Sequence, residues 1–187
     1  MGINFSDFDF KKGCYHNNNP AIFTHVDTIL PKLKFLKLNG FFTGEAGSVA
    51  WNYHVYFMYF RMRKTAKLLF DYYLPWEKKM NLVYHQVWNG VEPLSTDWHH
   101  DTGGGNIQFN LYHTDIDPNI GGEIMYRSVK EDNKITFAAL PKKYDIVMGS
   151  CGKDMKFQHR VEGFRTNKKK ERLTMLFRFS VEKSPWT

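Results

Sequence analysis

From residue 80 onward, the chain is a series of short segments with the pattern of β-strands, each ended by turn-forming residues. In the first segment, Leu82, Tyr84 and Trp88 stand on one side of an extended chain, because alternate residues of a strand point to opposite faces, and Gly90 follows. Many short strands at close spacing predict a β-sandwich, a barrel or a jelly roll. The other candidate strands are residues 107–112, 123–128, 135–140, 145–148, 159–161 and 172–181.

The chain before residue 80 has a different pattern. Residues 56–73 mix Lys, Arg, Ala, Leu and aromatic residues without Gly or Pro, and Pro75 follows, which predicts a helix. Residues 26–38 are a weaker helix candidate, because their apolar residues are irregularly spaced around Pro31. We therefore predict an α+β fold that is mainly β, with a jelly-roll core (a double-stranded β-helix) and N-terminal helices packed against one sheet. The 187 residues contain no internal repeat and no evident linker, so we expect a single domain over 1–187, with a helical support region over 1–79 and the core over 80–181.

Composition indicates which fold class, partners and cellular compartment suit the protein. Aromatic residues make up 17% of the chain, which favours pleated, half-buried surfaces. A net charge of +7 suits nucleic acid, an acidic peptide or a dicarboxylate, although it also suits solubility alone. Cys14 and Cys151 form neither a metal-binding spacing nor a disulfide framework, which favours a reducing, cytoplasmic location. The N-terminus lacks an apolar signal core, and no apolar run reaches the roughly 18 residues of a membrane span, so we expect no membrane partner.

The segment 97–101, Asp-Trp-His-His-Asp, contains a candidate pair of metal ligands. In an extended chain His99 and Asp101 point to the same side, whereas His100 points away. A third ligand must come from a distant part of the sequence, and His159 is the best candidate. Two imidazoles and one carboxylate on one face of an octahedron suit non-haem iron(II) and leave positions open for reagents. The sequence therefore predicts a metal site at His99, Asp101 and His159.

A second His-x-Asp pair, His113 and Asp115, shows that this pattern alone is common. The first pair is favoured by its context, because Trp98 precedes it and the glycines 103–105 follow it, which places it at a strand end beside a turn. The second pair lies just before the turn-forming residues 117–119. We interpret His100 as a polar neighbour of the first pair.

Residues 80–181 resemble the iron(II)/2-oxoglutarate oxygenase superfamily. Four features stand in the order that this superfamily has, and each is weak alone. They are His99-x-Asp101; Asn110-Leu111-Tyr112 leading into Gly121-Gly122-Glu123; Leu140-Pro141 and Tyr144–Met148 followed by His159-Arg160-Val161; and Arg172 at the start of 172–179.

The resemblance implies roles for these residues. His99, Asp101 and His159 would hold iron(II). Dioxygen and the co-substrate 2-oxoglutarate would react at this ion. Arg172 would bind the distal carboxylate of 2-oxoglutarate, since its planar fork matches a carboxylate, and Tyr112 would assist. Arg178 is a rival for this task, because it lies an even number of residues away on the same strand. The gap of 13 residues from His159 to Arg172 exceeds the family's usual ten or so.

The reaction that the resemblance implies is hydroxylation of a substrate, with release of succinate and carbon dioxide. It needs an apolar pocket beside the metal. Apolar strand residues suit such a pocket, and packing in the core accounts for them equally well. These residues are Ile107, Phe109, Leu111, Met148 and Leu176.

The prime substrate stays open between a protein or peptide, a small molecule and a nucleic acid. The turn at 121–123 resembles prolyl- and peptidyl-hydroxylases, which we slightly favour. The spacing of Arg172 and Arg178, with Asp97 before the first pair, resembles the AlkB-like nucleic-acid demethylases and nucleobase hydroxylases. Candidate contacts to a substrate or polyanion are Trp98, Arg160 and Arg178. A non-enzymatic alternative is a cupin-like binding or structural jelly-roll module.

Overall fold

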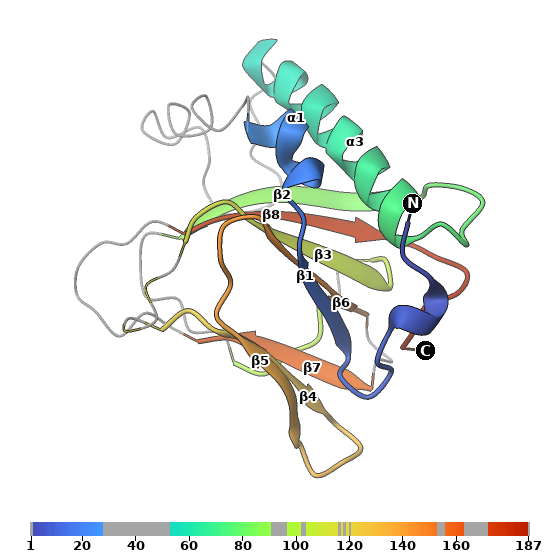
Figure 1. Ribbon diagram of the computed structural model, residues 1–187, viewed down its shortest axis with the longest axis vertical. Coiled ribbons are helices and arrows are strands. Elements are labelled where there is room, and N and C mark those ends of the chain that lie inside the picture. Colours follow the sequence, from blue (N-terminus) through green and yellow to red (C-terminus); the bar gives the residue numbers. More distant parts are fainter. Residues whose placement is uncertain are drawn as a thin grey trace.

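Strands dominate the structure and form two antiparallel sheets (Figure 1). The computed structural model describes residues 2–27, 53–90, 97–101, 104–115, 117, 119, 121–152, 156–162 and 172–186. The larger sheet has the order β1-β6-β3-β8-β2, made of β1 (Cys14–Asn18), β6 (Asp145–Ser150), β3 (Ile107–Tyr112), β8 (Arg172–Phe179) and β2 (Leu82–Gly90). The smaller sheet has the order β5-β4-β7, made of β5 (Ile135–Ala139), β4 (Ile124–Ser128) and β7 (Phe157–Val161). The prediction of a mainly β fold is therefore confirmed.

The chain passes repeatedly between the two sheets. The strands β2, β3, β6 and β8 belong to the larger sheet, whereas β4, β5 and β7 belong to the smaller one. All seven strands predicted after residue 80 are present, with ends that differ by a few residues. The first strand, β1, was not predicted. Its sequence, Cys-Tyr-His-Asn-Asn, lacks an apolar alternation, and it pairs with β6 at the edge of the larger sheet.

Among the described helices, the longest lies across the larger sheet (Figure 1). This helix, α3 (Tyr53–Tyr73), includes the predicted residues 56–73, and the chain leaves it before Pro75. The short helices η1 (Phe5–Asp7), η2 (Pro20–Phe23) and α1 (Thr24–Asp27) lie in the N-terminal part. The predicted helix 26–38 falls mostly outside the described residues. Among those described, no helix combines the length and apolar character that crossing a membrane needs.

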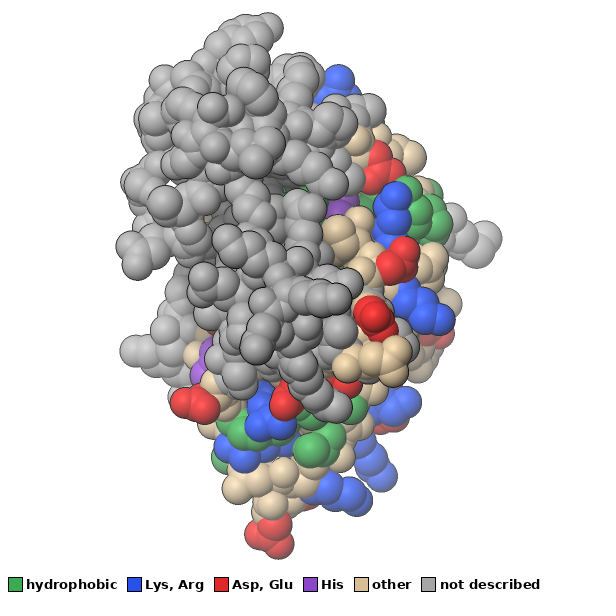
Figure 2. Space-filling view, turned by 90° about the vertical axis from the view of Figure 1, so that its left-hand side faces the viewer, with side chains coloured by type: hydrophobic (Ala, Val, Ile, Leu, Met, Phe, Trp, Pro, Cys, Tyr) green, Lys and Arg blue, Asp and Glu red, His purple; other side chains and the backbone are tan. Residues whose placement is uncertain are grey.

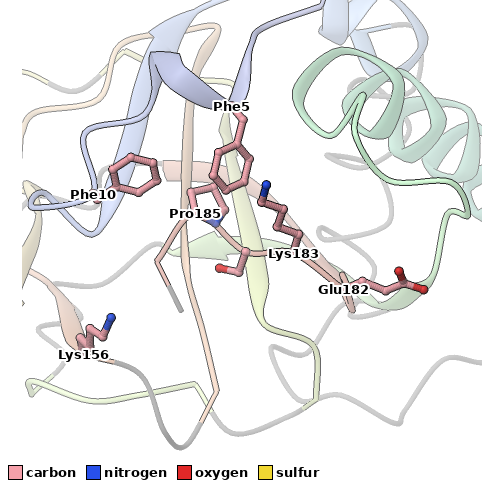
Figure 3. A pocket seen from close by; sticks show the side chains of 7 residues that line it. Phe5, Phe10, Lys156, Glu182, Lys183 and Pro185 are labelled. Atoms are coloured by element: carbon pink, nitrogen blue, oxygen red, sulfur yellow. The ribbon is translucent and has the colours of Figure 1, made fainter.

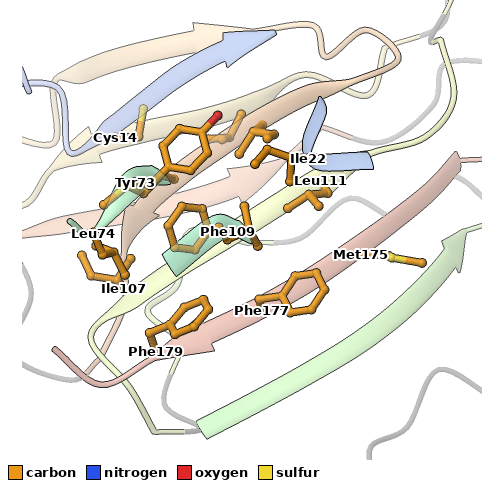
Figure 4. Packing of buried hydrophobic residues seen from close by; sticks show 14 of the residues in the cluster. Cys14, Ile22, Tyr73, Leu74, Ile107, Phe109, Leu111, Met175, Phe177 and Phe179 are labelled. Atoms are coloured by element: carbon orange, nitrogen blue, oxygen red, sulfur yellow. The ribbon is translucent and has the colours of Figure 1, made fainter. Parts of the chain in front are cut away.

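The main hydrophobic core lies between α3 and the larger sheet (Figure 4). The ring of Phe70 lies 6.3 Å from that of Phe179, and the ring of Tyr73 lies 5.5 Å from that of Phe109. Burying one such side chain stabilises the fold by roughly 1.5–3 kcal/mol. Alternate residues of β3 and β8, with odd numbers, supply this face of the sheet.

The other face of the larger sheet looks toward the smaller sheet and is more polar. In the antiparallel ladder Gln108 lies opposite Arg178, and Tyr112 lies opposite Thr174. On this face lie the even-numbered residues of β3 and β8. Of the five residues predicted for a pocket lining, Leu176 alone lies there. Ile107, Phe109, Leu111 and Met148 belong to the core on the helix side, because directly paired residues share a face.

Candidate metal centre

A single antiparallel bridge joins the segment 97–101 to β7. The backbone N–H of His99 donates to the carbonyl of His159, and the N–H of His159 donates to the carbonyl of His99, both at 3.1 Å. Paired residues of a ladder face the same side, so the two imidazoles meet, with ring centroids 4.5 Å apart. One ligand atom each from His99, Asp101 and His159 lies within 4.8 Å of the others. The structure therefore brings the three predicted ligands together from two distant segments.

Asp101 is held from two sides. Its Oδ2 lies 3.2 Å from Nε2 of His159, and its Oδ1 lies 2.9 Å from Nη2 of Arg178 and 3.7 Å from Nε2 of His99. Burial on its own raises the pKa of this carboxyl. The hydrogen bond and charge of His159, followed by the charges of Arg178 and His99, outweigh burial and lower the pKa to about 2. Asp101 is consequently an ionised donor at neutral pH.

The orientation of His99 is fixed by the backbone of its own segment. Its Nδ1 lies 2.6 Å from the carbonyl oxygen of Asp97, so Nδ1 carries the proton and donates to that carbonyl. The lone pair then resides on Nε2, which faces Asp101. A hydrogen bond from the other ring nitrogen to a carbonyl commonly orients a metal-binding imidazole. This contact could not be predicted from the sequence, because it involves a backbone atom.

Arg178 lies inside the protein beside the candidate metal ligands. Its side chain is almost completely buried, and its Nε donates to Oε1 of Gln108 at 2.7 Å. Arg178 thereby holds Oδ1 of Asp101 and leaves Oδ2 on the side of His159. From the sequence, Arg178 was a candidate both for the co-substrate anchor and for a substrate contact. Its position makes it a support for Asp101, which sequence spacing did not indicate.

Polar atoms without partners line the interior beyond Gln108. Nδ2 of Asn110 and Oγ1 of Thr174 are buried and have no hydrogen-bond partner among the described residues. The side chain of Tyr112 is buried opposite Thr174. A buried polar group without a partner costs about 1–3 kcal/mol, so such groups indicate a ligand or water. The strand β8 begins at Arg172, whose side chain lies outside the described part of the chain.

Tyr126 packs on His159, the third candidate ligand. It is paired with His159 across the smaller sheet, and their ring centroids are 5.4 Å apart. Its hydroxyl is buried and has no hydrogen-bond partner in the described part of the chain. The ring extends to the larger sheet at Gly149, where a Cβ atom would lie 2.1 Å from the hydroxyl oxygen. Tyr126 therefore fills the space between the sheets beside His159.

The outer face of the smaller sheet carries Trp98 and two arginines. The guanidinium carbon of Arg127 lies 4.6 Å from the Trp98 ring centroid, and that of Arg160 lies 5.1 Å from it. Nε of Arg127 donates to Gln158 at 2.9 Å, and Nη2 of Arg160 donates to Glu162 at 2.7 Å. Figure 2 shows basic side chains at this end of the molecule. The two candidate substrate contacts Trp98 and Arg160 thus touch each other.

The second His-x-Asp pair does not form a site. His113 is buried with its ring 4.8 Å from that of Phe23, and Oδ1 of Asp115 accepts the backbone N–H of Lys143 at 2.9 Å. In the part of the chain that the structure describes, the first pair with His159 is the one group with the geometry of a metal site.

A groove of about 500 Å³ lies elsewhere on the surface (Figure 3). Nζ of Lys183 sits 4.4 Å from the ring centroid of Phe5 at its edge. None of the candidate metal ligands lines this groove. Its lining residues are Phe5, Phe10, Lys156, Glu182, Lys183, Ser184 and Pro185.

Comparison with known proteins gives the class of the fold. No protein-family model matches the sequence, and no curated protein matches it. Solved structures of 2-oxoglutarate/iron(II) oxygenases, prolyl hydroxylases among them, do match the structure. The chain therefore has the fold of these oxygenases, and the resemblance seen in its sequence is confirmed at this level.

The matching structures belong to enzymes that catalyse different reactions. A prolyl 4-hydroxylase from Pseudomonas putida matches with a TM-score of 0.59 and 11% identity, over 92% of this chain and 94% of that one. A prolyl hydroxylase from Trichoplax adhaerens, in complex with a peptide fragment of hypoxia inducible factor, has a TM-score of 0.60 and 12% identity, over 91% and 84%. The α-ketoglutarate-dependent epimerase SnoN of nogalamycin biosynthesis has a TM-score of 0.61 and 14% identity, over 91% and 78%. A further SnoN structure contains Fe3+ and α-ketoglutarate. The His-Asp-His group of this chain fits iron binding in such a fold.

Proposed function

We propose that this protein is an iron(II)- and 2-oxoglutarate-dependent dioxygenase built on a double-stranded β-helix. The observation that carries the proposal is the convergence of His99, Asp101 and His159 within 4.8 Å, although 58 residues separate Asp101 from His159. A binding or structural module has no need of this donor set together with an ionised, arginine-supported Asp101. This argues against the cupin-like alternative.

We assign a proposed role to each residue of the centre. Nε2 of each histidine and Oδ2 of Asp101 would hold iron(II), which with 2-oxoglutarate and dioxygen supplies the oxidising power for hydroxylation and yields succinate and carbon dioxide. Asn110, Tyr112 and Thr174 line the interior where a carboxylate of the co-substrate would receive hydrogen bonds. Arg172, the first residue of β8, would supply the opposite charge.

A hydroxylase of the prolyl- or peptidyl-hydroxylase kind is the finer form of the proposal. Two of the three neighbours compared above are prolyl hydroxylases, one of them determined with a peptide. The nucleic-acid alternative gains no support from the two arginines on the outer face of the smaller sheet, because Arg127 and Arg160 are engaged with Gln158, Glu162 and Trp98. The turn at 121–123 agrees with the peptidyl form.

Turnover of 2-oxoglutarate tests the proposal. With iron(II), the wild-type protein is expected to convert 2-oxoglutarate slowly to succinate, and His99→Ala is expected to lose this activity because one ligand is missing. Succinate is measured by NMR, with and without proline-containing peptides, which should raise the rate if the peptidyl form is right. Equal turnover in wild type and His99→Ala would contradict the metal site.

The anchor of the co-substrate is tested by a matched pair of arginine variants. Arg172→Ala is expected to weaken 2-oxoglutarate binding by about 1.5–3 kcal/mol, because a charged hydrogen-bonding partner is lost, while metal binding stays unchanged. Arg178→Met is expected to change metal binding, because Oδ1 of Asp101 loses the guanidinium that positions it and balances part of its charge. Both affinities are measured by calorimetry. Unchanged 2-oxoglutarate affinity in Arg172→Ala would assign the anchor to another residue.

A further inference from the structure

The segment that carries His99 and Asp101 has contacts on both sides of the smaller sheet. On the inner side, His99 meets His159, and the two residues exchange backbone hydrogen bonds. The backbone N–H of Gly152 also donates to the carbonyl of Asp101 at 2.9 Å. On the outer side, the neighbouring residue Trp98 lies over β4 and β7, because successive side chains of an extended chain point to opposite faces.

The outer contact is made by charged groups that are already fixed. Arg127 of β4 lies opposite Gln158 of β7 and is hydrogen-bonded to it through Nε and Nη2. Arg160 is held by its ion pair with Glu162. Both guanidinium groups lie within the roughly 6 Å at which a cation and an aromatic ring attract each other. Gln158 and Glu162 already hold the two guanidinium groups in place. Stacking Trp98 on these groups therefore costs little additional side-chain entropy.

We propose that Trp98 is a positioning residue of the metal centre, clamped by Arg127 and Arg160 so that His99 and Asp101 stay in register with His159. This inference rests on the proposed function, because positioning of the ligands matters only if they bind metal. Two cation–π contacts on the outer face are similar in strength to the two backbone hydrogen bonds of the bridge. The clamp therefore contributes about as much as the bridge to the order of this segment.

Amide hydrogen exchange in the metal-free protein tests the clamp itself. The amides of His99 and His159 donate to each other's carbonyls, so their protection reports whether the bridge is closed. Trp98→Ala is expected to speed their exchange about 5- to 30-fold, while the amide of Phe109, within β3, keeps its protection. Unchanged exchange at His99 and His159 in Trp98→Ala would overturn the proposal.

Cobalt(II) titration tests the consequence for the site. Trp98→Ala is expected to raise the dissociation constant for Co(II) about 5- to 30-fold and to alter its visible absorption spectrum, whereas Trp98→Phe restores most of both. Arg127→Met with Arg160→Met removes both cations and is expected to act like Trp98→Ala; this double variant carries the test if the tryptophan variant fails to fold. Lys143→Met is the matched control, because it removes a cation stacked on Tyr144 away from the site.

The outcomes separate the two proposals. A wild-type protein that binds no Co(II) would contradict the proposed function, and the exchange data would still decide the clamp. Normal Co(II) binding by the wild type, together with an unchanged dissociation constant in Trp98→Ala and in the double arginine variant, would contradict the positioning role alone. A Trp98→Ala effect that the double arginine variant does not reproduce would also contradict it, since the arginines would then not hold the ring.

Discussion

At the scale of single residues, Asp101 shows how the two sheets share one carboxylate. Arg178, from the larger sheet, holds Oδ1, while His159, from the smaller sheet, lies against Oδ2. The two oxygens therefore differ in their contacts, because Oδ1 is bound by a guanidinium and Oδ2 lies beside an imidazole. Asp101 is thus held by one residue from each sheet.

His113 gives a prediction about pH at the same scale. Burial, and to a smaller degree the charge of Lys143, lowers its pKa to about 3, and the carboxylate of Asp27 lies 3.9 Å away, beyond hydrogen-bonding distance. The unfolded chain takes up this proton below about pH 6.5, but the folded protein does so only near pH 3. The contribution of neutral His113 to the free energy of unfolding is therefore fully present above about pH 6.5. It is lost as the pH falls toward 3, by about 1.4 kcal/mol per pH unit at most.

The measurement is urea unfolding of wild type and His113→Leu between pH 7 and 4. We expect the variant to lose less stability than the wild type over this range, because its side chain takes up no proton. The other titrating groups are common to both proteins and cancel in the difference. Parallel pH profiles of the two proteins would show that His113 is not buried in its neutral form.

The convergence of His99, Asp101 and His159 could be predicted from the sequence better than the contacts that support these residues. The spacing of His99 and Asp101 follows from the two-residue period of a strand, so it could be read directly. His159 was found because a third ligand was needed and a family order was visible. The contact of Arg178 with Asp101 could not be read, because it depends on the register of strands that are distant in the sequence. His113 and Asp115 have the same spacing as the first pair, and only their surroundings distinguish them.

At the scale of elements, the period of the strands was predictable, but the assignment of their faces was not. The segments 82–89 and 107–112 were recognised from composition and turn residues, and they form β2 and β3. Which face of β3 meets α3 is set by the long-range packing of Phe109 on Tyr73. The polar face with Gln108 and Asn110 therefore appeared only with the structure.

Gly149 gives a prediction about the distance between the sheets. A Cβ atom at this position would lie 2.1 Å from the hydroxyl oxygen of Tyr126 and 2.6 Å from its Cζ, so the ring must move. Gly149→Ala is expected to destabilise the protein by about 1–3 kcal/mol, as overpacking does. Urea unfolding measures this loss. In the background of Tyr126→Leu, Gly149→Ala should cost clearly less, and an equal cost in both backgrounds would show that Tyr126 is not the obstacle.

At the scale of the whole molecule, aromatic rings join the two ends of the described chain. The ring of Phe8 lies 5.6 Å from that of Trp186 and 5.5 Å from that of Trp76, which follows α3. The two ends lie near each other beside the larger sheet (Figure 1). This cluster fastens the N-terminal segment and the C-terminal residues to one another, on the side of the molecule where α3 ends.

Trp186 gives a prediction at this scale. Its side chain is 2% exposed, so Trp186→Ala is expected to destabilise the protein by about 3–5 kcal/mol. Trp186→Phe should cost less, because the buried Nε1 has no hydrogen-bond partner in the described part of the chain to lose. Phe10→Ala, at a ring that is 49% exposed, is the control and should change stability little. Thermal unfolding measures all three, and a small effect of Trp186→Ala would show that the cluster does not hold the ends.

The ion pair between Arg178 and Asp101 has a consequence for oxidation state. Part of the negative charge of the carboxylate is balanced by the guanidinium, so the three ligands together offer an ion less than one full negative charge. Coulomb attraction grows with the charge of the ion, and this loss therefore weakens the hold on a trivalent ion more than on a divalent one. An iron ion held by these residues would therefore be favoured in the ferrous over the ferric form before any reagent arrives.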